Sequence, residues 1–157
     1  HMAEMYASPE LQKHEQDVYA MGVALEKQRH IPQARRCYKL ASRGLTRAAS
    51  YGRLAQSYRR TGEIEAARAA WLEMIRLSEG WVTPYEALAK IYEHQDRDID
   101  AALDVTRRGL ALLAEPSLHT PETVQAAKNA LQYRYARLKR KQEKQRTLFP
   151  LSKDRRC

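Results

Sequence analysis

The 157-residue chain has few of the residues that build sheets, disulfide networks or membrane spans. It contains one phenylalanine, six glycines and six prolines, and residues that favour helices dominate the remainder. Because helix-forming residues dominate and β-branched residues are few, we predict an all-α protein. No uncharged apolar run approaches the roughly 18 residues that a membrane-spanning helix needs, so we expect no membrane partner.

Two cysteines are too few for a disulfide framework. Cys37 falls within a helical pattern beside Tyr38, and we expect it to be a small buried side chain. The N-terminus lacks the basic-then-apolar pattern of a secretory signal, so we expect a cytoplasmic protein. The opening His1-Met2 looks like a cloning remnant, and residues 1–8 are interpreted as a leader on a piece of a longer protein.

The net charge of +9 is concentrated at the C-terminal end of the chain. Residues 1–127 carry 17 basic and 17 acidic side chains, which balance. Residues 128–157 carry 11 basic side chains against two acidic ones, Glu143 and Asp154, which leaves the whole excess of nine. Any electrostatic attraction to nucleic acid would therefore involve the last thirty residues.

Three segments of the chain, 21–41, 54–74 and 88–109, align with one another. Each begins with a large residue followed by a small one, at Met21-Gly22, Leu54-Ala55 and Leu88-Ala89. Each continues with an isoleucine that starts a second helix and an alanine three residues later, at Ile31 and Ala34, Ile64 and Ala67, and Ile99 and Ala102. A small residue on each helix lets the two helices approach closely. Such short pairs bury their apolar faces only by stacking on neighbouring pairs.

The aligned pattern resembles the tetratricopeptide repeat (TPR), which has large-small-x-x-Tyr on its first helix and Ala-x-x-x-aromatic on its second. Tyr38 and Trp71 occupy the aromatic position, and Thr106 departs from it. The resemblance covers about residues 15–115. It implies an α-solenoid of three helix-turn-helix repeats.

A narrower resemblance concerns the third repeat, "YEALAKIYEHQDRDIDAALDVTRRGLAL". This segment is similar to the C-terminal TPR region of bacterial proteins that have a ribonuclease H-like exonuclease domain. None of the acidic metal-binding motifs of that enzyme occurs in this chain. The resemblance implies an accessory module without the nuclease.

The apolar spacing predicts seven helices, at 9–28, 32–44, 47–60, 63–79, 84–95, 98–114 and 121–146. The last helix carries an apolar stripe at helical spacing, formed by Val124, Ala127, Leu131, Tyr135 and Leu138. We expect this stripe to cover the open end of the stack, as a capping helix does. The predicted repeat domain therefore spans residues 9–146, with the capping helix at 121–146 and a flexible basic tail at 147–157.

Several residues mark the expected helix ends. Thr83 stands before Pro84, and Glu86 completes a capping box with Thr83. Gly62 and Gly80 fall where a helix ends and a left-handed residue is favoured. Asp98 precedes Ile99 and is predicted to cap the helix that follows.

The stretch "YEHQDRD", residues 92–98, is the densest cluster of potential metal ligands or catalytic groups. In the alignment, His94 ends a first helix, where the second repeat has Arg60 and the first has Lys27. A metal site needs three or four convergent ligands, and no second cluster completes this one. No nucleophile or phosphate-binding motif is present either. We therefore predict a chain that is not an enzyme, with no catalytic residue, metal or cofactor.

The TPR resemblance implies that the first helix of each repeat lines a concave groove. The residues expected to face a partner there are Tyr19, Val23, Glu26, Gln56, Arg59, Arg60, Glu86, Lys90 and Glu93. Their mixed charges favour a protein or peptide segment that carries both signs, and a solvated helix face is the alternative interpretation. A carboxylate clamp is not expected, because the clamp positions hold Tyr19, Val23, Arg53, Thr83 and Ala87 rather than lysines and asparagines.

The basic end of the last helix supports a different function. The residues that could contact phosphates are Arg134, Arg137, Lys139, Arg140, Lys141 and Lys144. They favour an auxiliary, non-specific nucleic-acid-binding module of a larger nuclease-type protein, and a solvated terminal helix is the other interpretation. Weak self-association through exposed end repeats is a third hypothesis. The main prediction is a non-catalytic scaffold for protein–protein interaction.

Overall fold

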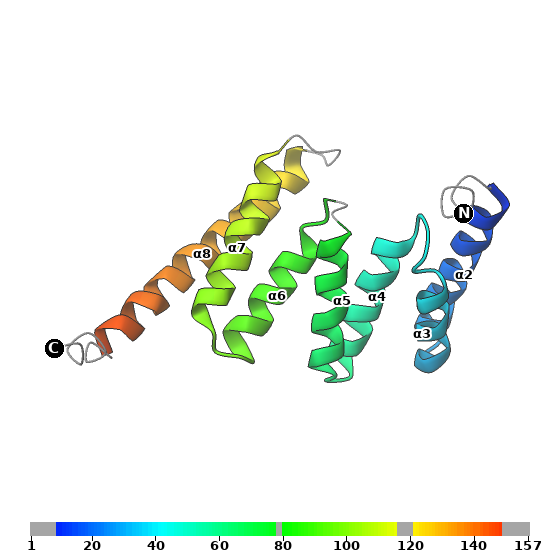
Figure 1. Cartoon of the computed structure of the whole chain (residues 1–157), viewed down its shortest axis with the longest axis horizontal. Coiled ribbons are helices and arrows are strands. Elements are labelled where there is room, and N and C mark those ends of the chain that lie inside the picture. Colours follow the sequence, from blue (N-terminus) through cyan, green and yellow to red (C-terminus); the bar gives the residue numbers. More distant parts are fainter. Residues whose placement is uncertain (1–8, 78–79, 116–120, 149–157) are drawn as a thin grey trace. The chain divides into compact units, whose positions relative to one another are not determined.

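The computed structural model describes residues 9–77, 80–115 and 121–148. Its helices are α2 Pro9–Lys27, α3 Ile31–Leu40, α4 Arg47–Arg60, α5 Ile64–Arg76, α6 Thr83–His94, α7 Ile99–Ala114 and α8 Pro121–Leu148 (Figure 1). The described ranges contain no strand, which confirms the predicted all-α class. None of the helices in these ranges has the length and apolar character needed to cross a membrane. The leader at 1–8 and residues 149–157 of the predicted tail lie outside the described residues.

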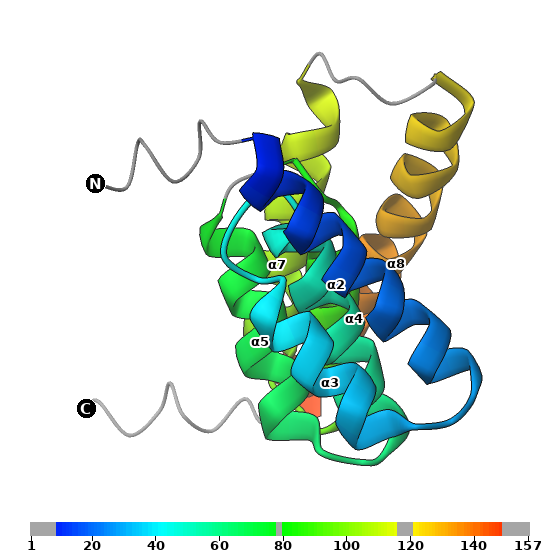
Figure 2. The ribbon, with the colours of Figure 1, turned by 90° about the vertical axis from the view of Figure 1, so that its right-hand side faces the viewer.

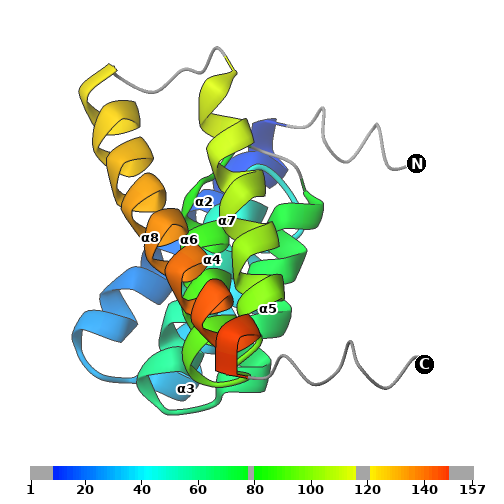
Figure 3. The same cartoon turned by 90° about the vertical axis from the view of Figure 1, so that its left-hand side faces the viewer.

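The chain divides into two compact units, unit 1 at 1–79 and unit 2 at 80–157. Within unit 1, α2 packs on α3, and α4 packs on both α3 and α5 (Figure 2). Within unit 2, α6 packs on α7, and α8 packs on the same helix (Figure 3). The predicted domain at 9–146 includes residues of both units.

The three helix pairs turn through the same corner. A backbone N–H closes each corner by donating to the carbonyl of a residue near the end of the first helix: His30 to Leu25 (2.9 Å), Glu63 to Tyr58 (2.9 Å) and Asp98 to Tyr92 (2.8 Å). The residue just before each of these donors has a left-handed backbone: Arg29 (φ 64°), Gly62 (φ 77°) and Arg97 (φ 54°). The second helix then starts at the aligned isoleucine in every pair. The aligned segments therefore repeat in backbone structure at their corners, and the extra residue of the third segment lies inside its turn.

The small residues of the pattern are buried between paired helices. Ala34, Ala67 and Ala102 are all buried. In the first pair, a Cβ added to Gly22 would lie 2.8 Å from Tyr38 Cε1, so only glycine fits against this ring. The third pair has Ala89 at the equivalent position and Thr106 in place of the aromatic residue, and the Thr106 hydroxyl donates to the Ala102 carbonyl at 2.7 Å. The close approach predicted from the large-small pattern is present in the first pair, and the equivalent small residue is buried in the third.

Helix α8 covers α7 through its apolar stripe. Leu138 is buried in a cluster with Ile99, Ala102 and Leu103 of α7. Leu131 is also buried, and its Cδ1 lies 3.1 Å from the position that a Cβ on Gly109 would take. The other members of the stripe, Val124, Ala127 and Tyr135, are partly buried. The predicted packing face of this helix is confirmed, and the helix extends two residues beyond the predicted end.

The second helix of the first pair is shorter than predicted, because α3 ends at Leu40 instead of residue 44. The Ser42 hydroxyl donates to the Lys39 carbonyl at 2.7 Å, and the Thr46 hydroxyl donates to the Ala41 carbonyl at 2.7 Å. Hydroxyl side chains that bond to nearby carbonyls compete with the continuing helix. Gly44 lies in the turn after the helix, and a Cβ added to it would lie 1.7 Å from Glu15 Oε2. The local hydroxyl bonds therefore account for the early end of the helix.

The predicted capping box at the start of α6 is wrong. Thr83 is the first helical residue, Val82 occupies the N-cap position, and no side chain caps the helix. The Glu86 carboxylate instead pairs with Lys90 at 3.0 Å, one turn along the helix. Asp98 does cap α7, because its Oδ1 accepts a hydrogen bond from the Ala101 N–H at 3.0 Å. Gly62 and Gly80 both have φ 77°, which confirms their predicted left-handed conformation.

Candidate functional site

Glu26 joins three helices of unit 1. Its side chain is only 9% exposed, although it belongs to the predicted groove. The Tyr38 hydroxyl on α3 donates to Glu26 Oε2 at 2.5 Å, and Arg60 Nη1 on α4 donates to Oε1 at 2.7 Å. Arg53 Nη1, also on α4, lies 3.7 Å from Oε2. Glu26 thus neutralises part of the arginine charge on α4 and fixes α2 beside it.

A second contact between α2 and α4 involves Tyr19. Arg53 Nε donates to the Tyr19 hydroxyl at 3.4 Å, and this hydrogen bond is the main cause that raises the pKa of Arg53. The Tyr19 ring also lies against that of Tyr38, with 5.8 Å between the ring centroids. Burial and the hydrogen bond to Glu26 raise the pKa of Tyr38 far above its usual value, so its hydroxyl remains a proton donor.

The predicted groove residues of unit 1 therefore lie on one pair of neighbouring helices. We define the α2/α4 face as Tyr19, Val23, Glu26, Arg53, Gln56, Arg59 and Arg60. Tyr19, Val23 and Gln56 are partly buried, whereas Arg59 and Arg60 are exposed. This face combines apolar surface, an amide and guanidinium groups, a combination that can contact a peptide.

Glu93 of unit 2 is not the exposed groove residue that the sequence led us to expect. Its side chain is 0% exposed, and all of its hydrogen bonds reach α8. Arg134 Nη1 donates to Glu93 Oε2 at 2.9 Å and Arg137 Nη2 donates to the same oxygen at 2.7 Å. Lys141 Nζ donates to Oε1 at 2.6 Å. The correction has a clear cause, because the cations of α8 cover this position of α6.

Burial raises the pKa of the Glu93 carboxyl, and the hydrogen bonds from Lys141 and Arg137 more than offset this effect. The net result is a pKa below the usual glutamate value, so Glu93 is ionised at neutral pH. The exposed His94 imidazole adds a weaker neighbour, with its Nε2 3.6 Å from Glu93 Oε2. Glu93 and its three α8 cations are called the Glu93 cluster below.

The Glu93 cluster divides the basic residues that were predicted to contact nucleic acid. Arg134, Arg137 and Lys141 are bound to Glu93, and Arg134 is only 13% exposed. Lys139, Arg140 and Lys144 are exposed on the same helix. Only half of the predicted set therefore presents its full charge to solvent. Of the other groove residues in unit 2, Glu86 and Lys90 pair with each other.

Glu26 and Glu93 stand at equivalent places in the sequence repeat, four residues after Gly22 and Ala89. In both units the carboxylate binds cations that are seven residues apart on a neighbouring helix: Arg53 and Arg60 on α4, and Arg134 and Lys141 on α8. The second repeat has Arg59 at the corresponding position. Sequence reasoning missed this arrangement. Its signal was a glutamate at a fixed repeat position followed by cations with a seven-residue spacing.

The cluster "YEHQDRD" forms the corner between α6 and α7. His94 ends α6 with an exposed side chain, and Asp98 caps α7. Within the part of the chain that the structure describes, no group of three or more His, Cys, Asp or Glu side chains could hold a metal ion. The geometry assigns Asp98 to helix capping.

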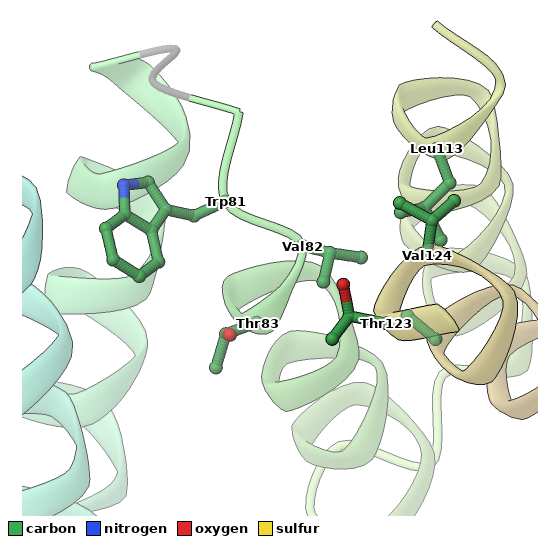
Figure 4. Close-up of a pocket in the computed structure, with 7 residues that line it drawn as sticks. Trp81, Val82, Thr83, Leu113, Thr123 and Val124 are labelled. Atoms are coloured by element: carbon green, nitrogen blue, oxygen red, sulfur yellow. The ribbon is translucent and has the colours of Figure 1, made fainter. Parts of the chain in front are cut away.

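Unit 2 also has a small apolar hollow of about 180 Å³ between the start of α6, the end of α7 and the start of α8. Its lining residues are Trp81, Val82, Thr83, Leu113, Thr123, Val124 and Ala127. Figure 4 shows Val82 and Thr123 facing each other, with Leu113 beside Val124. The Trp81 indole N–H and the two threonine hydroxyls are the polar side-chain groups of the lining, and no lining side chain titrates near neutral pH. This hollow offers apolar contact but no acid–base group.

Comparison of the chain with known protein families, with curated proteins and with solved structures found no match.

Proposed function

We propose that the chain is a non-catalytic scaffold of the TPR type that binds a protein segment along the first helices of its repeats. The proposal includes the TPR relationship and the cytoplasmic location expected from the sequence. The recurring corner and the buried small residues support the repeat architecture. The observation that carries the proposed function is the α2/α4 face of unit 1.

This face suits a bound segment because it is already ordered by its own contacts. The bonds from Arg60 to Glu26 and from Arg53 to Tyr19 hold the two helices together before a partner arrives. A preorganised surface loses less conformational entropy on binding. Partly exposed Tyr19 and Val23 supply apolar contact, and the Gln56 amide can both donate and accept hydrogen bonds.

Selection from a random peptide display library, followed by fluorescence anisotropy with the selected peptides, tests the proposal. We expect Tyr19→Ala to weaken binding by about tenfold, because this change removes a central aromatic contact and corresponds to about 1.4 kcal/mol. Arg36→Ala, on the exposed side of α3, serves as the control and should leave the affinity unchanged. Circular dichroism verifies that both variants fold. A library that yields no binder, or binders indifferent to Tyr19→Ala and Gln56→Ala, would contradict the proposal.

The alternative function is non-specific nucleic-acid binding through α8. The exposed side chains of Lys139, Arg140 and Lys144 support it, because they are outside the Glu93 cluster. Three phosphate contacts would give weak binding that falls steeply with salt concentration. The test is oligonucleotide binding at low and high salt by the parent chain and by the Lys139→Gln, Arg140→Gln, Lys144→Gln triple variant. Equal binding by both proteins would rule out this role for the three residues.

A further inference from the structure

We propose that the segment bound by the α2/α4 face is acidic and that its carboxylates pair with Arg53, Arg59 and Arg60. This inference depends on the proposed function and specifies the chemistry of the partner. The sequence led us to expect a segment that carries both charges. In the structure the Glu26 carboxylate is nearly buried, whereas the arginines of this face are exposed or partly exposed and can reach a partner.

The α2/α4 face keeps a positive charge once its internal pairs are formed. Glu26 is the single acidic member of the α2/α4 face, and its carboxylate is nearly buried beneath its partners. Three arginines and one glutamate leave a net charge of about +2 on this face. Helix α4 contains four arginines and no acidic residue. The next acidic residue, Glu63, pairs with Arg35 of α3 at 3.0 Å.

The internal bonds of the face leave several guanidinium donors unused. A guanidinium has five N–H groups, and Arg60 uses Nη1 for Glu26. The side chains of Arg53 and Arg60 are 39% and 58% exposed, so their other donors reach solvent. Arg59 is exposed, and its guanidinium takes part in none of the ion pairs among the described residues. Outward-facing guanidinium groups match carboxylates through paired hydrogen bonds.

The apolar and amide groups of the face suit a peptide better than a nucleic acid. The cations alternate with the partly exposed apolar surface of Tyr19 and Val23 and with the Gln56 amide. An extended acidic peptide can place carboxylates on the arginines and apolar side chains between them. The planar groups of the three arginines pair with carboxylates and phosphates alike, so the choice of a peptide rests on the apolar and amide surface between the cations. These features favour an acidic peptide with interspersed apolar residues.

Fluorescence anisotropy with the full chain and three labelled peptides tests this inference. The peptides are a short repeat of Glu-Leu-Glu-Ser units, the same peptide with glutamine for every glutamate, and the same peptide with lysine for every glutamate. We expect the acidic peptide to bind about tenfold more tightly than the glutamine peptide, and the lysine peptide not to bind. Arg59→Glu should weaken the acidic peptide by at least about tenfold, since it reverses an unpaired charge on the face.

Arg36→Glu makes the same charge reversal at an exposed residue of α3, outside the α2/α4 face, and should leave binding unchanged. Arg59 forms no ion pair with the described residues, so Arg59→Glu should preserve the melting temperature. An unchanged melting temperature then verifies that the variant folds. A glutamine peptide that binds as tightly as the acidic one, with both weakened by Tyr19→Ala, would overturn the charge inference and leave the proposed function standing. An Arg59-dependent preference for a single-stranded oligonucleotide over the acidic peptide would overturn it as well. Failure of all the peptides and of the display library would overturn both proposals.

Discussion

The two units hold a first helix against its neighbour by the same device with different chemistry. In unit 1, Glu26 shares its bonds between a tyrosine hydroxyl on α3 and arginines on α4. In unit 2, Glu93 is completely buried, and all three of its hydrogen-bonding cations come from α8. Much of the positive charge on α8 therefore stabilises unit 2 through Glu93. A count of basic residues therefore overstates what this helix offers to a partner.

The largest effect is expected for Glu93→Gln. This change leaves three cations of α8 without their shared carboxylate. We expect a loss of about 2–3 kcal/mol in the free energy of unfolding of unit 2, less than for a fully buried pair because Arg137 and Lys141 can reach water. Glu26→Gln should cost about half as much, because Tyr38 can still donate to an amide oxygen and the arginines are more exposed. Urea unfolding followed by circular dichroism measures both, and equal losses would show that the two clusters are equivalent.

Acid should destabilise unit 2 through the same residue, to a smaller extent than the Glu93→Gln substitution. The pKa of Glu93 is lower in the folded protein than the ordinary value of 4.5. The stabilising contribution is therefore complete above that value and declines as pH falls through the lower, folded pKa. Urea midpoints between neutral pH and pH about 3 should fall less steeply for Glu93→Gln than for the parent chain. Identical pH profiles would exclude Glu93 as a source of this acid sensitivity.

The small residues of the helix pairs provide a third comparison. Glycine-to-alanine changes inside helices normally stabilise by about 1 kcal/mol. Gly22→Ala should instead destabilise unit 1 by about 1 kcal/mol, because the new Cβ would lie 2.8 Å from Tyr38 Cε1. Gly52→Ala is the matched control, since the added Cβ would lie 3.5 Å from its nearest neighbour, the Met74 terminal methyl carbon, which is an ordinary contact distance. Thermal denaturation should give opposite signs for the two variants, and a stabilising Gly22→Ala would show that the Tyr38 ring moves aside at little cost.

The smallest expected effect concerns the corners. Arg29 and Arg97 adopt the positive φ that Gly62 supplies at the equivalent position. Arg29→Gly in unit 1 and Arg97→Gly in unit 2 should each stabilise by about 0.5–1 kcal/mol, because glycine has no strain in this region. Gly62→Ala should destabilise by about 1 kcal/mol for the same reason, with no steric contribution because no atom lies within 4 Å of its would-be Cβ. Differential scanning calorimetry of the three variants measures these changes. If only one of the two arginine-to-glycine variants were stabilised, the backbone strain would differ between the two corners.

The sequence was sufficient for the helices, the corners and the buried small residues, because these depend on local spacing. The aligned isoleucines mark the starts of α3, α5 and α7, and Leu131 and Leu138 lie on the buried face of α8 as predicted. The pattern could not reveal the burial of Glu93, since that depends on cations 41 to 48 residues further along the chain. Periodicity identifies an apolar face, but a charged residue at its edge can be solvated or covered by a neighbouring helix. The end of α3 was predicted wrongly, because the Ser42 and Thr46 hydroxyls bond to the carbonyls of Lys39, in its last turn, and Ala41, just after it.

The bonds of Glu93 make the C-terminal half of α8 unsuitable as a removable tail. A truncation ahead of Arg134 would strip away all three counter-ions of a carboxylate that water barely reaches, and would also take Leu138 out of its cluster with Ile99, Ala102 and Leu103. We expect the shortened product to be destabilised, so a loss of binding on truncation would not by itself show that the positive charge is needed. Shortened versions of this chain should therefore end after Lys141, so that the anchoring ions stay in place.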